Sequence, residues 1–107
     1  FIKDLENETV YRFIVEKDSV RISKIKLSQD EDRVVFNYSV DKNYRGQGLG
    51  TEIVKQGEKF AKSNINNINK FVAYVRGSNK GSCKIFKKLN YTIVFSNDDY
   101  VIYEKKI

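Results

Sequence analysis

Residues 44–51 form the most chemically informative segment of the chain, with the sequence Tyr-Arg-Gly-Gln-Gly-Leu-Gly-Thr. A strand-like apolar run precedes the segment at residues 34–40, and an amphipathic helix pattern follows it. This order suits an anion site, because free N–H groups at a helix N-terminus attract phosphate and glycine lets the phosphate come close. A glycine pair in a basic loop is weak evidence alone, and the flanking elements strengthen it.

Two common phosphate-binding motifs do not fit this segment. No Lys-Ser or Lys-Thr pair follows the glycines, which excludes a P-loop. Gly46 and Gly48 have the spacing of the first two glycines of the dinucleotide fingerprint, but Gly50 falls one position short of the third. The acidic residue expected about twenty positions further on is also missing, because Asn69 and Lys70 stand there.

The segment resembles the acyl-CoA-binding signature of the GNAT superfamily of N-acetyltransferases, Gln/Arg-x-x-Gly-x-Gly/Ala. Arg45, Gly48 and Gly50 fill the fixed positions of that signature. Residues 79–91 resemble the family's later segment, which has Asn-x-x-Ala/Ser, then an aromatic residue, then Gly-Phe. The two matches lie in the family's order along the chain.

The resemblance implies that acetyl-CoA is the co-substrate and that its pantetheine arm lies between two splayed strands, those of Tyr38 and Phe71. The main chain near Tyr38 would pair with the arm and hold the thioester carbonyl, and amides of the glycine-rich loop would take the pyrophosphate. Asn79 would contact the arm, cap the following helix, or do both. The expected cofactor-binding residues are Ser39, Val40, Arg45, Gly46, Gln47, Gly48, Leu49, Gly50, Thr51 and Asn79.

The acid that would protonate the leaving group is left open by the sequence. Many GNAT enzymes have Tyr at the position of Phe86, and its hydroxyl protonates the departing thiolate, whereas Phe has no proton to give. The helix spacing of Phe86 is typical of a core residue. The leaving group would therefore use water, another acid, or no acid, since CoA thiolate is a tolerable leaving group.

The general base is equally open. Family members often use a carboxylate on a central strand, directly or through water. The expected central strands offer only other polar groups, those of Asn37, Ser39, Tyr74 and Arg76. Tyr74 is expected to pack or to form a substrate wall, and Cys83 is a poor nucleophile because the chain has no His. Four acidic residues are expected to be solvated in turns: Glu31, Asp32, Asp98 and Asp99.

Composition limits the size of the protein and several classes of function. A length of 107 residues allows one domain, residues 1–107. The chain has no His, and none of its Cys or carboxylate residues form a cluster with the spacing of metal ligands, so no metal site is expected. No apolar run approaches a membrane span, and the single Cys83 fits a reduced cytoplasm.

The net charge of +6 suits a polyanion such as coenzyme A. Aromatic residues do not interleave with basic ones as a nucleic-acid platform needs.

The start of the chain predicts a piece of a longer protein, because the sequence begins with Phe1 and contains no Met. GNAT proteins usually have a strand and two helices before the strand expected at residues 11–16. The resemblance implies that most of these elements are missing, that residues 1–8 end the second helix, and that much of the acceptor wall comes from the missing part.

The patterns predict an α+β fold, a GNAT-like mixed sheet with the order β-β-β-α-β-α-β-β. A bulge is expected near Ser23 and Lys24, where the apolar phase changes. The strands flanking the first helix should be parallel with a right-handed crossover. The expected strands are residues 11–16, 20–27, 34–40, 71–75, 91–95 and 100–104, and the expected helices are residues 51–62 and a segment capped by Ser78 or Asn79.

The predicted function is an acetyl-CoA-dependent N-acetyltransferase acting on a primary amine. A looser resemblance to acetyltransferase domains attached to bacterial nucleotide-sugar enzymes makes an amino sugar the first choice of acceptor. A protein or peptide amine and a non-catalytic acyl-CoA-binding or sensing module are the alternatives. Neither nucleic acid nor a membrane is expected as a partner. A homodimer through the strand at residues 11–16 or the C-terminal hairpin is expected, unless the domain is part of a larger chain.

Overall fold

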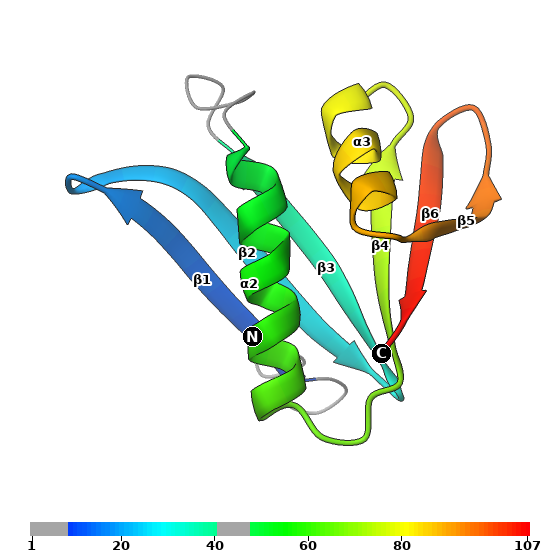
Figure 1. Ribbon diagram of the computed structural model, residues 1–107, viewed down its shortest axis with the longest axis horizontal. Helices are drawn as coiled ribbons and strands as arrows, with labels where there is room; N and C mark the ends of the chain where they lie inside the picture. Colours follow the sequence, from blue (N-terminus) through cyan, green and yellow to red (C-terminus); the bar gives the residue numbers. More distant parts are fainter. Residues whose placement is uncertain (1–8, 41–47) are drawn as a thin grey trace.

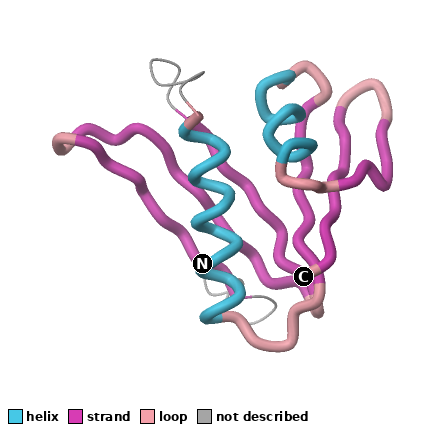
Figure 2. The backbone as a smooth tube through the Cα atoms, in the orientation of Figure 1, coloured by secondary structure: helices cyan, strands magenta, loops and turns pink. Residues whose placement is uncertain are grey.

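The computed structural model describes residues 9–40 and 48–107, which form one mixed sheet and two helices (Figure 1). The six strands have the order β1-β2-β3-β4-β6-β5, so the α+β prediction and the predicted order of elements are confirmed. Both helices cover the same face of the sheet (Figures 1 and 2). The segment expected to end a helix at residues 1–8 lies outside the described residues. The elements are β1 (Thr9–Lys17), β2 (Val20–Asp30), β3 (Arg33–Val40), α2 (Leu49–Asn64), β4 (Lys70–Arg76), α3 (Lys80–Lys88), β5 (Thr92–Ser96) and β6 (Tyr100–Lys106).

The first three strands form an antiparallel meander whose register contains one bulge. The register shifts between Val15 and Glu16, which pair with Ser23 and Arg21, so Ile22 is the extra residue on β2. Ile22 and Ser23 are both buried, each 3% exposed. The predicted bulge lies just after this point. Val20 and Ile22 share a parity in the sequence, so the alternation looks regular as far as Ile22.

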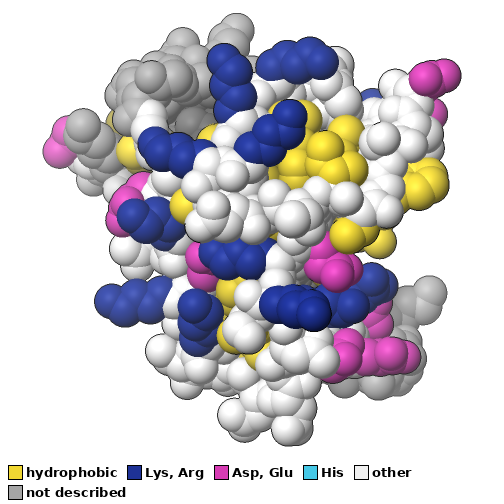
Figure 3. All heavy atoms as spheres, turned by 45° about the vertical axis from the view of Figure 1, so that its right-hand side comes forward, with side chains coloured by type: hydrophobic (Ala, Val, Ile, Leu, Met, Phe, Trp, Pro, Cys, Tyr) yellow, Lys and Arg dark blue, Asp and Glu magenta, His cyan; other side chains and the backbone are white. Residues whose placement is uncertain are grey.

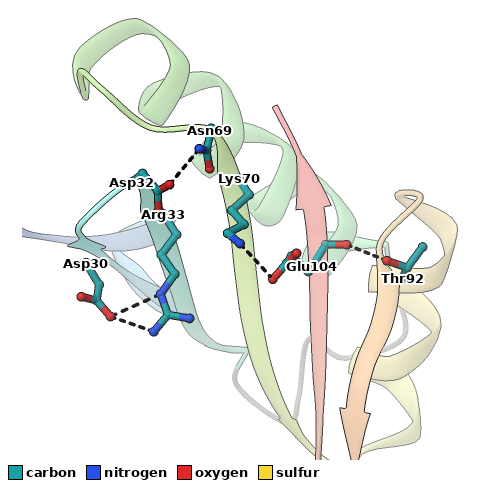
Figure 4. A network of polar contacts seen from close by, with 7 residues as sticks. All are labelled: Asp30, Asp32, Arg33, Asn69, Lys70, Thr92 and Glu104. Carbon is teal, nitrogen blue, oxygen red and sulfur yellow. Dashed lines mark hydrogen bonds and ion pairs between the residues drawn. The ribbon is translucent and has the colours of Figure 1, made fainter.

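The strand β2 continues through Asp30, three residues beyond the predicted end of the strand at residue 27. The turn consists of Glu31 and Asp32, and Glu31 adopts a positive φ of 57°. Asp30 pairs with Arg33 in the ladder, and the Arg33 Nη2 atom lies 2.8 Å from an Asp30 carboxylate oxygen (Figure 4). The ion pair explains why a polar stretch stays in the strand, because it satisfies charged groups across the turn.

Helix α2 begins two residues earlier and ends two residues later than the predicted 51–62. Its apolar stripe packs on β2 and β3 as the helical period predicts. Gly57 lies in this stripe, and a Cβ built there would lie only 3.0 Å from Ile25 Cδ1. The helix leads to β4, which pairs parallel with β3 as predicted.

The second half of the sheet packs under α3. Phe86 is 1% exposed, so the prediction of a core position is confirmed. Its ring stacks on Tyr103 at 5.7 Å and meets Tyr91 edge-on at 5.0 Å between centroids. The C-terminal hairpin is shifted from the prediction, because Tyr91 is buried before β5 begins at Thr92 and β6 runs on to Lys106.

Candidate functional site

The strands β3 and β4 separate at the end that lies near the helix N-termini (Figure 1). Their pairing runs from Arg33 opposite Lys70 to Phe36 opposite Ala73 and then stops. Both strands continue, β3 to Val40 and β4 to Arg76. The splayed pair that the family resemblance implied is therefore present.

A cavity of about 250 Å³ lies at this opening. Side chains of a strand alternate between the two faces of a sheet. The lining includes adjacent residues of both strands, such as Asn37 with Tyr38 and Tyr74 with Val75, so the cavity reaches both faces. The lining residues are Phe36, Asn37, Tyr38, Ala73, Tyr74, Val75, Arg76, Asn79, Ser82 and Phe86.

Tyr38 and Ser82 bridge the opening from β3 to α3. The Tyr38 Oη atom lies 2.9 Å from Ser82 Oγ, and either hydroxyl can donate. Burial raises the pKa of Tyr38, and the hydrogen bond with Ser82 acts in the opposite direction. The Tyr38 ring also meets Phe86 edge-on, with 6.0 Å between centroids. The family resemblance implied a role for the Tyr38 main chain and none for its hydroxyl.

The N-terminus of α2 lies beside the same opening. Gly48 is the N-cap with φ 78°, in the left-handed region that glycine favours, and the N–H groups of Leu49, Gly50 and Thr51 belong to the first turn, where no intrahelical partner exists. Such donors suit a pyrophosphate. Arg45, Gly46 and Gln47 lie outside the described residues.

Gly50 has a packing reason to be glycine, separate from any phosphate. It is buried, and a Cβ built there would lie 2.5 Å from Ile85 Cδ1 and 3.5 Å from Tyr38 Oη. From the sequence, the approach of phosphate was the predicted reason for glycine at both Gly48 and Gly50. The structure adds close packing between α2 and α3 at this position.

Asn79 is the N-cap of α3, as one of its two predicted roles required. Its Oδ1 atom accepts a hydrogen bond from the Ser82 N–H at 3.1 Å. Asn79 also lines the cavity, and its contact with a cofactor stays a prediction. Ser39 and Val40 pair with β2 beyond the last β3–β4 pair, so they border the splayed region, and their part in binding is likewise still a prediction.

A second cavity of about 250 Å³ adjoins the first on the face that neither described helix covers. Phe36, Asn37 and Tyr74 line both cavities, and Lys26, Ser28, Asp30 and Val35 complete the second. Ser28 and Asp30 lie beyond the predicted end of this strand at Leu27, and no binding role was predicted for Lys26. Their spacing of two, on the parity opposite the buried Ile25 and Leu27, was the signal that could have found them.

Asp30 lines the second cavity with a carboxylate, the group that family members often use as general base, and its side chain is 47% exposed. It accepts hydrogen bonds from Nε and Nη2 of Arg33, at 3.3 and 2.8 Å. The central strands β3 and β4 carry no Asp or Glu, in agreement with the prediction, and the neighbouring strand β2 brings Asp30 to the edge of the second cavity.

Within residues 9–40 and 48–107, no group of three or more His, Cys, Asp or Glu side chains could hold a metal ion. None of the helices in those ranges is long and apolar enough to cross a membrane.

Several solved structures of known proteins share this fold. The chain is similar to the Campylobacter jejuni N-acetyltransferase PseH in complex with acetyl coenzyme A, with 22% identity, a TM-score of 0.79, and coverage of 98% of this chain and 74% of that one. It is also similar to the Vibrio cholerae spermidine N-acetyltransferase in complex with CoA and spermine, at 15% identity, a TM-score of 0.78 and coverage of 98% and 70%. An acetyltransferase of the GNAT family from Streptococcus pneumoniae gives 13% identity, a TM-score of 0.79 and coverage of 95% and 68%. No curated protein matches the chain in a sequence search.

The sequence model of the Acetyltransferase (GNAT) family matches residues 1–91, most of the chain. The expectations of an acyltransferase and of acetyl-CoA as co-substrate are confirmed at the level of the family. The chain belongs to the GNAT family of acetyltransferases.

Proposed function

We propose that this chain transfers the acetyl group of acetyl-CoA to the primary amine of a small polar acceptor, with an amino sugar as the first choice. The observation that carries the proposal is the opening between β3 and β4, where a cavity reaches both faces of the sheet. The acyl donor enters from the helix side, and the acceptor approaches from the other face. The two reactants would then meet between the strands, which gives the proximity that acyl transfer requires.

The donor side consists of main-chain groups rather than side chains. Beyond Phe36, β3 has no β4 partner, so residues 37–40 can pair with the pantetheine arm as a strand pairs with a neighbour. The first turn of α2 supplies amide donors for the pyrophosphate. The role of Asn79 at the arm belongs to the same proposal.

The acceptor side is small and polar. A volume of about 250 Å³ is below the ~300–1,000 Å³ of pockets for drug-sized ligands, which favours a small amine over a folded protein. Lys26, Ser28, Asp30 and Asn37 offer donors and acceptors for hydroxyl groups, and the Asp30 carboxylate can accept from an amine. An amino sugar carries both kinds of group, which fits the looser resemblance to nucleotide-sugar enzymes.

Other acceptors fit these walls less well. A polyamine would bring several positive charges to walls that already carry Lys26, and the Asp30 carboxylate is already paired with Arg33. A peptide amine is the next choice, because the second cavity opens on the sheet face that neither described helix covers. Phe86 in place of Tyr favours the alternative of a non-catalytic acyl-CoA-binding module. We place the enzyme in the cytoplasm, where a free Cys83 stays reduced.

The test is thiol release from acetyl-CoA in the presence of a panel of amino sugars, polyamines and peptides. We expect turnover with an amino sugar, and Asp30→Asn should raise the acceptor KM about tenfold, because a charged hydrogen bond contributes roughly 1.5–3 kcal/mol. Asp98→Asn, in the exposed turn of the C-terminal hairpin, is the matched control and should leave KM unchanged. Folded chain that binds CoA but releases no thiol with any amine would contradict the proposal.

A further inference from the structure

The cavity between β3 and β4 contains a phenol for which the family motif gives no role. Tyr38 lines the cavity from β3, and Ser82 and Phe86 line it from α3. The Tyr38 hydroxyl lies 2.9 Å from Ser82 Oγ, and its ring contacts Phe86 edge-on. The hydroxyl therefore lies in the same cavity as the residue that replaces the tyrosine of many GNAT enzymes.

The other polar side chains of this cavity are two amides, a guanidinium, a serine hydroxyl and a second phenol. The amides of Asn37 and Asn79 and the guanidinium of Arg76 do not release a proton near neutral pH. Tyr74 is 50% exposed, and it lies on the strand parity opposite the buried Ala73 and Val75. Tyr38 is the phenol on the helix side of the opening, where the acyl donor would enter.

The surroundings of Tyr38 suit the loss and the return of a proton. Burial raises the pKa of the phenol, so it holds its proton at neutral pH. The hydrogen bond with Ser82 lowers that pKa, because an Oγ–H that points at the phenolate stabilises it. The first turn of α2 is close, since a Cβ on Gly50 would lie 3.5 Å from Tyr38 Oη, and a helix N-terminus favours negative charge.

We infer that Tyr38 is the general acid of the acetyl transfer and that Ser82 is its positioning residue, an assignment that rests on the proposed function. The amine nitrogen forms a bond to the thioester carbonyl carbon and loses one proton to solvent. The carbon–sulfur bond breaks, its electron pair goes to sulfur, and Tyr38 Oη gives its proton to that sulfur. Ser82 Oγ–H holds the phenolate until a solvent proton restores the phenol.

The test compares kcat for thiol release and the Kd of CoA in variants of the whole chain. Tyr38→Phe should lower kcat about tenfold to hundredfold, at or below the ~10²–10⁴ of general acids, because thiolate is a good leaving group. The Kd of CoA should not change. Phe86→Tyr, added to Tyr38→Phe, should restore most of the lost kcat, a rescue that a purely structural role would not give. Tyr11→Phe is the control, because the Tyr11 ring lies on β1 and packs on Phe60, with 5.2 Å between the ring centroids.

A readout without turnover follows the phenol directly. Ser82→Ala should move the ionisation of Tyr38, measured by ultraviolet absorbance of the phenolate, to higher pH, because the hydrogen bond that lowers the pKa is gone. The high-pH limb of the kcat profile should move in the same direction. Tyr38→Phe removes this ionisation and so assigns it.

Three results would overturn the assignment while the proposed function stands. They are an unchanged kcat in Tyr38→Phe, a loss without rescue that comes with weaker CoA binding, and a loss of kcat in Tyr74→Phe instead. A wild-type chain that binds CoA and never releases thiol would overturn the proposed function and the acid together, so the two failures are distinguishable.

Discussion

Gly48 holds a backbone conformation that few other residues accept, with φ 78°. A Cβ there would meet nothing within 4 Å, so the cost of a substitution comes from the backbone and not from a clash. Gly48→Ala should lower the free energy of unfolding by about 1 kcal/mol, measured by urea denaturation. Gly48→Asn is the matched control and should cost less, because Asn tolerates the left-handed region. Equal losses for both variants would contradict this account.

Tyr91 and Lys105 surround a buried carboxylate on α2. Tyr91 Oη donates to Glu58 Oε2 at 2.6 Å, and Lys105 Nζ lies 3.0 Å from the same oxygen. Burial and, after it, the hydrogen bond to Glu58 raise the pKa of Tyr91. A phenol whose folded pKa is raised contributes stability that is complete below the unfolded value near 10 and is lost as the pH rises above it.

The melting temperature should therefore fall as the pH rises above about 10, the unfolded tyrosine pKa. Tyr91→Phe should make this fall shallower, while it lowers stability at neutral pH by about 1–3 kcal/mol because Glu58 loses a donor. Tyr100→Phe on β6 serves as the comparison. A fall of equal slope in wild type and Tyr91→Phe would show that Tyr91 plays no part.

Residue type predicted some of these positions well and missed others. Asn79 as a helix cap follows from the local preferences of Asn. Asp30 was missed because its place depends on Arg33 across the turn. The role inferred for the Tyr38 hydroxyl depends on its contact with Ser82, which lies 44 positions further on, and no local sequence pattern contains that contact.

At the scale of elements, the packing of α2 on the sheet depends on close approach at Gly57. A Cβ there would lie 3.0 Å from Ile25 Cδ1 and 3.5 Å from Leu27 Cδ2. Gly57→Leu should lower the free energy of unfolding by about 1–3 kcal/mol, because extra methylenes strain a packed core. Lys55→Leu, exposed on the same helix, should change it little. A neutral Gly57→Leu variant would mean that this interface is loosely packed.

Periodicity predicted the kind and order of every described element, and the ends were less accurate. Helix α2 extends beyond its apolar stripe because a left-handed Gly48 starts it earlier. Strand β2 extends beyond its apolar residues because polar Ser28 and Asp30 pair with β3. Tertiary pairing, which the sequence does not display, sets these boundaries.

At the scale of the whole molecule, the sheet leaves two edges, β1 and β5. Both edges had been predicted as sites of self-association, and β5 has the stronger apolar surface. Ile93, Val94 and Phe95 are 49%, 52% and 47% exposed. Figure 3 shows hydrophobic side chains among lysines and arginines on the side that carries α3 and the C-terminal hairpin. The register shift at Val94 interrupts the edge, so side chains rather than strand addition would make the contact.

We expect a two-fold symmetric dimer through this surface, measured by sedimentation equilibrium. Phe95→Lys should shift the equilibrium toward the monomer, because it places a charge among the apolar side chains. Ile14→Lys, on the opposite sheet edge and 56% exposed, is the matched control. A strict monomer at high concentration, or dissociation by Ile14→Lys alone, would contradict the assignment to β5.

The central claim is that the opening between β3 and β4 and the N-terminus of α2 bind acetyl-CoA. The most direct measurement is the melting temperature of the chain with and without CoA, with dephospho-CoA and ADP at equal ionic strength as controls. At a concentration of about 100 Kd, binding adds about 2.7 kcal/mol. Each kcal/mol raises the melting temperature of a domain of about 100 residues by roughly 4–8 °C. We predict a rise of about 10 °C or more with saturating CoA and a smaller rise with ADP, whereas an unchanged melting temperature in a folded sample at millimolar CoA would contradict the account.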